Sequence, residues 1–170
     1  RRPCRARLSA SQKLHNKKQW GASGHSHAET INAWRIETGS ISVLDYGCGR
    51  GTLKPALNKL DPAAVVFEYD PGIPEKNIPP QPADLLVATD VLEHIEPWFL
   101  IETLEHMRRL ALNGAYFTIA LTPAKETLPD GRNAHICLLP SHEWQFKLRA
   151  AGFKAMKQEL NTKGLWVWCI

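Results

Sequence analysis

The chain has 170 residues, of which 44% are hydrophobic, and this length accommodates one globular domain with a substantial core but no second full domain. Its apolar runs stay well short of the ~18 residues that a membrane-spanning helix requires, and its first residues lack the apolar core of a signal peptide. We therefore expect a single small α/β domain in the cytoplasm, neither embedded in a membrane nor secreted.

The formal net charge of +4 is concentrated in residues 1–20, which we treat as a basic N-terminal arm ahead of a main domain at 21–170. Seven Lys and Arg residues precede the first acidic residue, Glu29, and the remaining 14 basic and 17 acidic residues give a net charge of −3. Such an arm attracts phosphate-rich partners such as nucleic acids, although a solvated chain end has the same composition. The four cysteines form no C-x-x-C pair, so reduced thiols are expected in place of a zinc site or disulfides.

The main domain is predicted to begin with a turn at residues 21–27, followed by a helix over residues 28–36. The turn has the sequence Gly-Ala-Ser-Gly-His-Ser-His and could fold over a ligand as a lid. Its histidines, His25 and His27, are equally explained as solvent-exposed loop residues, which is the commoner outcome. In the helix, Ile31 and Trp34 recur on one face, which predicts that this face packs on the core.

The most informative pattern is a short apolar strand at residues 43–46 that runs into a loop with glycine at every second position, 47, 49 and 51. These glycines let the main chain turn tightly and approach a ligand, and the helix predicted from Thr52 to Leu60 can face an anionic group with its first amides. The G-x-G-x-G spacing differs from the dinucleotide fingerprint and from the phosphate loop, so a nucleoside triphosphate site is not expected. An ordinary strand-to-helix turn remains the alternative.

Together with the acidic residue before the turn, this loop resembles the first motif of class I S-adenosylmethionine-dependent methyltransferases, whose loop wraps the methionine end of the cofactor. The resemblance implies S-adenosylmethionine as cofactor and six contacting residues: Asp45, Tyr46, Gly47, Cys48, Gly49 and Gly51. The G-A-S-G sequence at residues 21–24 is similar to a G-[TA]-S-G segment found at this place in short phage and bacterial methyltransferases. If a phage encodes the protein, we expect it in the host cytoplasm.

Further strands are predicted at Val65–Tyr69, Leu85–Thr89 and Ala115–Leu121, which are compact apolar runs of the kind that is buried on both faces of a parallel sheet. Two last strands, Phe153–Glu159 and Leu165–Ile170, are joined by a turn sequence and predict an antiparallel hairpin at the sheet edge.

Helices separate most of these strands. Pro97 marks the first turn of a helix that ends near Asn113-Gly114, because apolar residues recur at helical spacing between them. A later helix over residues 142–151 has Ser141 as its predicted N-cap and is closed by Gly152.

This succession predicts an α/β, Rossmann-like, doubly wound and mostly parallel sheet with an antiparallel C-terminal hairpin, the architecture that the class I resemblance also implies. We expect a strand order near 2-1-4-5-7-6 in the family's numbering, with the third strand missing. Between Asp70 and Asp84 lie thirteen residues, five of them proline, which are too few and too stiff for a strand and a crossover helix.

Asp70 ends the second strand, where a doubly wound sheet places an acidic side chain opposite ribose hydroxyls. A carboxylate accepts hydrogen bonds from both hydroxyls, so Asp70 is the best polar candidate for cofactor binding, with Pro71 beside it. Because the third strand is missing, residues 70–73 and the strand at 85–89 would supply most of the adenosine pocket. The alternative is that Asp70 only begins the turn at Pro71-Gly72.

A second polar segment, TDVLEH at residues 89–94, lies at the carboxyl end of the next strand, where open α/β sheets bind ligands. It resembles the post-strand segment of many class I enzymes, particularly O-methyltransferases of the ubiquinone-pathway type, in which it faces the methyl group. The resemblance implies that Asp90 and Val91 contact the cofactor and that Glu93 and His94 act as acid/base groups or metal ligands. Alternatively, Glu93 and His94 merely open the next helix.

A third polar cluster, residues 130–135, occupies a long loop after the fifth strand of the family, and loops of this length are often functional. In this fold the loop would overhang the same sheet edge and bring His135 within reach of the methyl acceptor. An imidazole titrating near neutrality can take a hydroxyl proton as the oxygen attacks the sulfonium methyl, so His135 is a candidate catalytic base. A solvated loop histidine is the alternative.

The array of Asp90, Glu93 and His94 with the later His135 resembles the E-x-x-E-H plus distal histidine of metal-dependent 2′-O-methyltransferases that act on small-RNA ends. Those enzymes also have an acidic-aromatic pair similar to Glu143-Trp144 here. Two carboxylates and two imidazoles could hold a divalent ion that binds an acceptor hydroxyl. The first ligand is Asp where that family has Glu, so a divalent metal is an alternative and not the main expectation.

Two missing motifs narrow the acceptor. No [DNS]-P-P-[YFW] sequence follows the fourth strand of the family, and Pro3-Cys4 lies far from where a cytosine-C5 enzyme needs its cysteine, so methylation of DNA bases is disfavoured. We predict transfer to an oxygen, with nitrogen second, of a small molecule, sugar or nucleic acid. The alternatives are a cofactor-binding partner subunit without activity of its own and an enzyme that docks nucleic acid through its arm.

Overall fold

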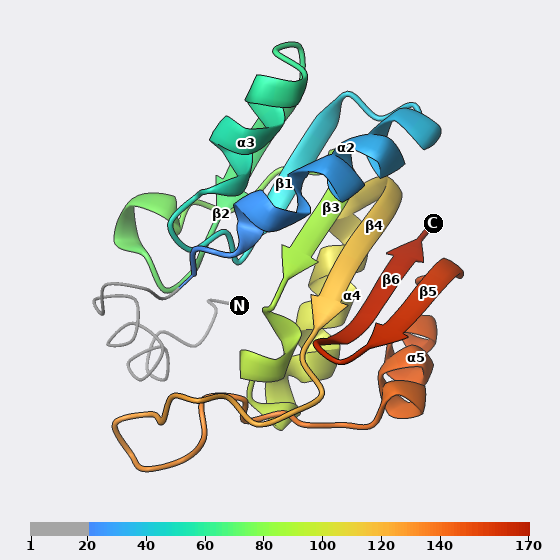
Figure 1. Cartoon of the computed structure of the whole chain (residues 1–170). Coiled ribbons are helices and arrows are strands. Elements are labelled where there is room, and N and C mark those ends of the chain that lie inside the picture. Colours follow the sequence, from blue (N-terminus) through green and yellow to red (C-terminus); the bar gives the residue numbers. More distant parts are fainter. Residues whose placement is uncertain (1–20) are drawn as a thin grey trace.

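The computed structural model describes residues 21–170, which form a six-stranded sheet with helices on both faces (Figure 1). The strand order is β2-β1-β3-β4-β6-β5. The strands are β1 (Ser42–Tyr46), β2 (Val65–Tyr69), β3 (Ala83–Thr89), β4 (Ala111–Ile119), β5 (Ala155–Asn161) and β6 (Gly164–Cys169). The first four run parallel, whereas β6 pairs antiparallel with β4 and with β5. The predicted fold, strand order and C-terminal hairpin are confirmed, while the basic arm lies outside the described residues.

The helices lie in two layers and differ in length. Those on one face are α2 (Ala28–Glu37) and α3 (Leu53–Leu60), preceded by the 3₁₀ helix η1 (Gly24–His27). Those on the other face are α4 (Leu100–Leu110) and α5 (Ser141–Ala150), and three further 3₁₀ helices lie in the connections: η2 (Pro74–Lys76), η3 (Leu92–His94) and η4 (Pro97–Phe99). Within this described part of the chain, no helix is long and apolar enough to cross a membrane.

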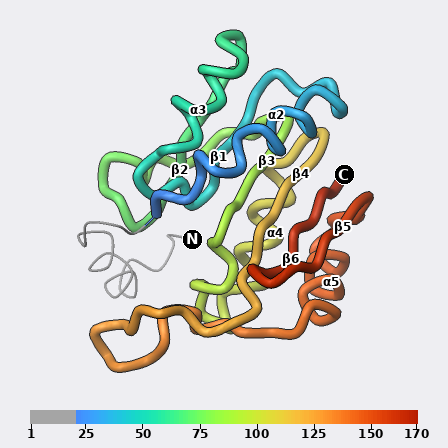
Figure 2. Tube along the Cα trace, in the orientation of Figure 1, coloured from blue at the N-terminus to red at the C-terminus, as the bar shows by residue number. Residues whose placement is uncertain are grey.

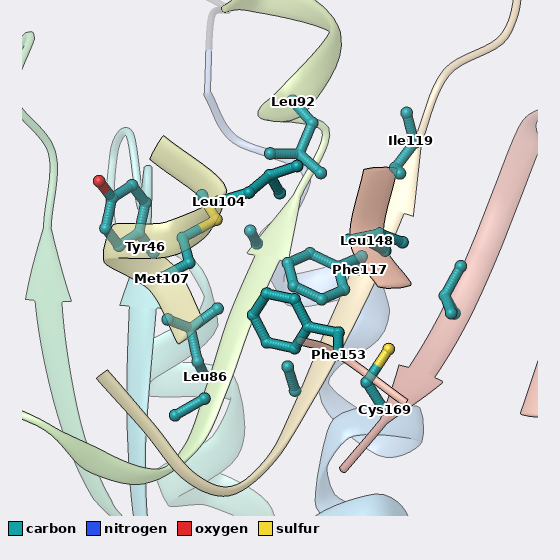
Figure 3. Close-up of a cluster of buried hydrophobic side chains, with 14 of the residues drawn as sticks. Tyr46, Leu86, Leu92, Leu104, Met107, Phe117, Ile119, Leu148, Phe153 and Cys169 are labelled. Carbon is teal, nitrogen blue, oxygen red and sulfur yellow. The ribbon is translucent and has the colours of Figure 1, made fainter. Parts of the chain in front are cut away.

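Each face of the sheet carries its own apolar layer. Leu104 and Met107 of α4 and Leu148 of α5 meet Phe117 of β4 in one layer (Figure 3). In the other layer, α2 and α3 pack on the opposite side chains of the same strands through four residues: Ile31, Trp34, Leu53 and Leu57. The apolar strands β1 and β3 are therefore buried on both faces, as their sequences predict.

The connection from β2 to β3 contains only the short helix η2, so β2 is an edge strand of the sheet (Figure 2). The prediction that β2 is buried on both faces is wrong, because Val65 and Phe67 keep 44% and 45% of their surface exposed. The proline-rich connection that follows β2 is too short to hold a further strand and crossover helix, as expected from its length, so among residues 21–170 no such strand pairs with the outer edge of β2.

The boundary between α4 and β4 differs from the prediction. The helix ends at Leu110 and the strand starts at Ala111, so Asn113-Gly114 lies inside the strand and does not end the helix. A Cβ on Gly114 would stand 2.8 Å from the carbonyl oxygen of Cys169, so this glycine allows β6 to approach β4. Glycine here signals close strand packing, which sequence reasoning took for a helix stop.

The C-terminal elements are also shifted by small amounts. Pro140 is the N-cap of α5 and Ser141 its first helical residue, so the predicted cap at Ser141 is wrong by one position. Gly152 closes α5 with a φ of +93°, as predicted. Phe153 then packs against Phe117, with ring centroids 5.0 Å apart, and β5 begins two residues later than expected because Phe153 belongs to the core.

Candidate active site

The loop between β1 and α3 is held by its own backbone and by the end of β2. The N–H groups of Gly47 and Cys48 donate to the carbonyl oxygen of Tyr69 at 2.7 and 3.1 Å. Gly47, Gly49 and Gly51 have φ values of +75°, +50° and +72°, a backbone region that residues with a Cβ rarely adopt. The path of the chain therefore requires glycine at all three positions.

The space beside these glycines is filled by other parts of the protein. A Cβ at position 47 would lie 2.6 Å from Cγ2 of Val91, and one at position 49 would lie 2.5 Å from the carbonyl oxygen of Gly21. At position 51 it would collide with the Glu68 carboxylate. The sequence analysis expected a ligand beside these glycines, whereas in the structure Val91, Gly21 and Glu68 occupy that space.

Asp70 anchors the glycine loop from the end of β2. Its side chain is 4% exposed, and its Oδ2 accepts a hydrogen bond of 2.9 Å from the N–H of Gly49. Its Oδ1 accepts one of 2.8 Å from the N–H of Gly72, so the turn that starts at Pro71 is present as well. Contact with ribose hydroxyls stays a prediction for Asp70 and Pro71.

Asp45 lies beneath the loop on the face of the sheet that α2 and α3 cover. It is 2% exposed and stands in register with Glu68 of β2. Burial, followed by the nearby Glu68 charge, raises the pKa of Asp45 to about 7. Lys76 of η2 binds the same region, because its Nζ lies 3.1 Å from the carbonyl oxygen of Gly49 and 3.4 Å from Oε1 of Glu68. Strand register was the signal that could have found Glu68, which the sequence analysis missed.

Two other predicted cofactor residues, Tyr46 and Cys48, are nearly buried. The hydroxyl of Tyr46 lies 3.0 Å from Nδ1 of His106 on α4, and its ring packs on Tyr69 with centroids 4.8 Å apart. Burial raises the pKa values of the Tyr46 hydroxyl and of the Cys48 thiol. Both side chains are therefore neutral packing groups, and the loop presents its backbone as the candidate binding surface.

The turn at residues 21–27 packs directly on the glycine loop. The carbonyl oxygen of Gly21 accepts a hydrogen bond of 2.9 Å from the N–H of Arg50. The hydroxyl of Thr52 donates to the carbonyl oxygen of Ala22 at 3.1 Å and accepts from the N–H of His25 at 3.2 Å. The turn thus adjoins the predicted cofactor site, and sequence reasoning missed Thr52 as the residue that fastens it there.

His27 is buried, in contrast to the solvent-exposed alternative considered for it. It is 9% exposed, and its Nδ1 lies 3.3 Å from the hydroxyl of Tyr116 on β4. Its ring packs edge-on against Trp166 with centroids 5.5 Å apart. Burial lowers the pKa of His27, which favours the neutral ring. His25 is exposed, as that alternative expected.

Asp90 and Val91 start the segment that follows β3. Asp90 has a φ of +55°, and its Oδ1 accepts a hydrogen bond of 2.9 Å from the hydroxyl of Thr118. Its N–H donates to the carbonyl oxygen of Thr118 at 3.0 Å, so Asp90 is turned toward β4. Val91 lies against Gly47. This segment therefore touches the glycine loop at its first residues.

Glu93 is fully buried in η3, a few residues further along the same segment. Its Oε1 accepts a hydrogen bond of 2.9 Å from the N–H of Ala120, just after β4. Its Oε2 has no hydrogen-bond partner in the part of the chain that the structure describes. Burial raises the pKa of Glu93 to about 8. A buried carboxyl oxygen without a partner is costly, so this group requires an explanation.

His94 and His135 meet beside Glu93, with ring centroids 4.9 Å apart. Nδ1 of His94 lies 2.8 Å from the carbonyl oxygen of Ala134, and Nδ1 of His135 lies 2.6 Å from that of Thr122. Because a carbonyl oxygen can only accept, each Nδ1 carries a proton, and in the neutral form of each ring the lone pair lies on Nε2.

One candidate ligand atom from each of Glu93, His94 and His135 lies within 4.8 Å of the others. The fold thus brings together three of the four residues predicted as metal candidates, from segments forty residues apart. Asp90 is not part of this cluster among the described residues. Glu143 is not part of it either, and Trp144 is fully buried in the core under α5.

The long loop at residues 120–140 is fixed to the segment after β3, beside which it runs (Figure 1). The N–H of Cys137 donates to the carbonyl oxygen of Glu93 at 2.9 Å. Oδ1 of Asn133 accepts from the N–H groups of Ala124 and His135, both at 2.9 Å, and its Nδ2 donates to the carbonyl oxygen of Ala124. Asn133, which sequence reasoning missed, therefore shapes the loop and sets the position of His135.

A model of the methyltransferase domain family matches residues 2–158. This chain belongs to the methyltransferase domain family. The G-x-G-x-G loop and the class I sheet fit that membership, which makes S-adenosylmethionine the methyl donor of the domain. No curated protein matches the chain.

Solved methyltransferase structures share this fold at low sequence identity. An O-methyltransferase family protein from Burkholderia thailandensis has a TM-score of 0.66 and 13% identity, over 95% of this chain and 57% of its own. The 1,6-didemethyltoxoflavin-N1-methyltransferase of the same organism, with bound S-adenosylhomocysteine, has a TM-score of 0.63 and 16% identity over 99% and 91%. Magnesium protoporphyrin IX methyltransferase from Synechocystis has a TM-score of 0.63 and 15% identity, over 95% of this chain and 91% of its own. The chain thus spans little more than half of the first protein and most of the other two.

Proposed function

We propose that this domain transfers the methyl group of S-adenosylmethionine to an oxygen atom of a small-molecule acceptor, beside Glu93, His94 and His135. One observation carries the proposal: the segment at residues 90–94 lies against the glycine loop through Val91 and reaches the polar cluster through Glu93 and His94. A cofactor on the loop and an acceptor at the cluster would therefore be neighbours, which is the arrangement that direct methyl transfer requires.

The chemistry assigns a role to His135. Its Nδ1 is protonated and held by Thr122, so its Nε2 can accept the proton of an acceptor hydroxyl. The acceptor oxygen then forms a bond to the sulfonium methyl carbon, the carbon–sulfur bond breaks, and its electron pair returns to sulfur. The products are a methyl ether, S-adenosylhomocysteine and a protonated imidazole that returns its proton to solvent. A positioned base of this kind contributes about 10²–10⁴-fold in rate.

The choice of acceptor rests on the neighbours and on the cluster. The similar structures include an O-methyltransferase family protein, an N1-methyltransferase named for 1,6-didemethyltoxoflavin and a methyltransferase named for magnesium protoporphyrin IX, so two of the three names give a small molecule. An oxygen acceptor must lose its proton as it is methylated, and the cluster offers a base for that step, whereas many nitrogen acceptors are neutral nucleophiles. A small hydroxylated molecule or a sugar is therefore the preferred acceptor, and nitrogen is second.

Transfer of a labelled methyl group from S-adenosylmethionine into fractionated cell extract tests the proposal. Label is expected in a small-molecule fraction, and His135→Ala is expected to lower the transfer rate at least ~100-fold while S-adenosylhomocysteine still raises the melting temperature. His142→Ala, an exposed histidine on α5, is the matched control and is expected to leave the rate unchanged.

Three results would contradict parts of this proposal. Cofactor binding without label in any fraction would indicate a non-catalytic partner subunit. Label in RNA or DNA that falls steeply with salt and on deletion of residues 1–18 would indicate a nucleic-acid acceptor docked by the arm. An unchanged rate in His135→Ala would remove the assigned base.

A further inference from the structure

We propose that Glu93, His94 and His135 bind one divalent transition-metal ion, which holds the acceptor oxygen during methyl transfer. The proposal rests on the proposed function and specifies how its polar cluster works when the ion is bound. Three kinds of observation carry it: the positions of the ligand atoms, the unpartnered oxygen of Glu93, and the bonds that hold both loops in place.

The ligand atoms are close to the separation that a shared ion requires. One atom of each residue lies within 4.8 Å of the others. Metal–ligand distances of about 2.0–2.2 Å put neighbouring ligands of a tetrahedral ion ~3.5 Å apart. The ligand atoms must therefore move together by up to about 1.3 Å when the ion binds, and we assign this movement to rotation of the three side chains.

The ring orientations suit metal binding. A metal-ligating histidine typically donates its other ring N–H to a carbonyl or carboxylate, which fixes the tautomer and the ring orientation. Both histidines do this, His94 toward Ala134 at 2.8 Å and His135 toward Thr122 at 2.6 Å. With Nδ1 of each ring engaged by a carbonyl group, Nε2 is the ligand atom that we assign to each histidine.

Glu93 supplies the observation that points most directly to a ligand. It is fully buried, and its Oε2 has no partner among residues 21–170, while its Oε1 is already bound to the N–H of Ala120. Buried carboxylates are stabilised by paired charges or by metal ions. In the described part of the chain no Lys or Arg forms an ion pair with Glu93, so a cation at the cluster would supply the missing charge and the missing bond together.

The two segments that bring these ligands are fixed to each other. The N–H of Cys137 donates to the carbonyl oxygen of Glu93 at 2.9 Å, and Arg132 forms two hydrogen bonds to the carboxylate of Glu96 at 2.9 and 3.1 Å. Together with Asn133, which binds the N–H of His135, these contacts position the ligands before any ion arrives. A preorganised site of this kind loses little conformational entropy on binding.

The donor set indicates the class of ion. Two imidazoles and one carboxylate favour Zn²⁺, Mn²⁺, Fe²⁺ or Co²⁺ over Mg²⁺ and Ca²⁺, which prefer oxygen ligands. Three protein ligands leave at least one coordination position for the acceptor hydroxyl, and the bound ion lowers the pKa of that hydroxyl. In the metal-bound state Nε2 of His135 is a ligand and not the base that it provides without the ion, so the hydroxyl proton passes to solvent water. The oxygen bonds to the methyl carbon, and the carbon–sulfur electron pair goes to sulfur. No oxidant or reductant is involved.

Cobalt is the best probe, because Co²⁺ bound by histidine and carboxylate has visible absorption bands that need no activity assay. The full chain is treated with chelator, dialysed and titrated with Co²⁺. One Co²⁺ per chain is expected. Glu93→Gln and His135→Ala are expected to weaken its affinity by about 100-fold or more, since each removes a direct ligand.

His142→Ala is the matched control and is expected to bind Co²⁺ as tightly as the unmodified chain. Glu93→Gln keeps the side-chain shape and an oxygen acceptor for Ala120, and its circular dichroism melt checks that it folds. Equal Co²⁺ affinity in the unmodified chain, Glu93→Gln and His135→Ala would overturn the metal site.

The two proposals fail separately. Full methyl transfer in excess chelator, without a Co²⁺ signal, would end the metal site and leave the proposed transfer reaction intact. A Co²⁺ site that depends on Glu93 and His135, without methyl transfer into any fraction, would keep the metal site and contradict the proposed function.

Discussion

The two halves of the candidate site are built in opposite ways. The cofactor half consists of the glycine loop and the end of β2. There the N–H of Gly49 donates to the Asp70 carboxylate, and the N–H of Gly51 donates to the carbonyl oxygen of Cys48. In the acceptor half, residues 90–96 and 120–140, the buried Oε2 of Glu93 has no partner in the described chain. The first half is held by hydrogen bonds between its own segments, whereas the second contains a group that a ligand would complete.

Each half also contains one buried carboxyl group with a raised pKa. Burial raises the pKa of Asp45 to about 7 and that of Glu93 to about 8. Asp45 comes from a regular strand and has the Glu68 carboxylate as its neighbour, while Glu93 comes from a short 3₁₀ helix beside two histidines. The two carboxyl groups are thus similarly buried but have different neighbours, so substitutions in each half can test the two groups separately.

The largest effect is expected for Gly49→Ala in the cofactor half. The new Cβ would lie 2.5 Å from the carbonyl oxygen of Gly21, at a φ of +50°. We expect S-adenosylhomocysteine to raise the melting temperature of this variant by no measurable amount, because the loop must shift. Gly39→Ala is the matched control, since its φ is +65° and its Cβ would meet nothing within 4 Å.

The control separates backbone strain from collision. Gly39→Ala is expected to lose about 1–2 kcal/mol of stability from left-handed strain and to keep its cofactor-induced shift. A normal shift in Gly49→Ala would contradict the view that the cofactor half is rigidly closed by its own backbone.

A smaller effect, on stability and its pH dependence, is expected for Asp45→Asn. The folded pKa of Asp45, about 7, lies above its ordinary value of 3.8, so the folded state retains a proton that the unfolded state loses between about pH 4 and 7. The contribution of Asp45 to the free energy of unfolding therefore falls as pH rises through this window, by about 4 kcal/mol in total.

Urea unfolding at pH 5 and pH 8 measures this contribution. Relative to the unmodified chain, Asp45→Asn is expected to be more stable at pH 8 than at pH 5, because the amide carries no charge to bury. A stability difference that does not change with pH would show that Asp45 titrates normally. In Glu68→Gln, the free energy of unfolding should fall less between pH 5 and pH 8 than in the unmodified chain, since the Glu68 charge is the second cause of the raised Asp45 pKa after burial.

The smallest effect is expected for Asn133→Ala in the acceptor half. This change removes the bonds that Asn133 makes to Ala124 and His135, so the loop that carries His135 loosens. We expect methyl transfer to fall about tenfold, equivalent to ~1.4 kcal/mol, with cofactor binding unchanged. Arg132→Ala, whose ion pairs are exposed, should change stability little. Equal losses of cofactor binding and transfer in Asn133→Ala would contradict the division into halves.

The cofactor half could largely be predicted from sequence because its signals are local. Glycines at 47, 49 and 51 report backbone conformation directly, and Asp70 follows an apolar strand by one residue. The contact of Gly21 with Gly49 could not be predicted, because it joins a turn to a loop nearly thirty residues away.

The acceptor half was predicted as a set of residue types but not as a geometry. His94 and His135 were both identified as candidates, yet only the bonds of the 120–140 loop place their rings together. Asp90 has the same kind of side chain as a metal ligand, but its left-handed backbone turns it toward Thr118. Burial of Glu93 depends on the packing of two loops, which no sequence periodicity encodes.

The proline-rich connection between β2 and β3 has a consequence for the cost of folding. Prolines at 71, 74, 79, 80 and 82 restrict φ in the unfolded chain as well as in the native one. Ordering this connection therefore sacrifices less conformational freedom than ordering a flexible loop of equal length. The lower cost of ordering this stiff connection therefore offsets part of the stability that a further strand and crossover helix would contribute to the core.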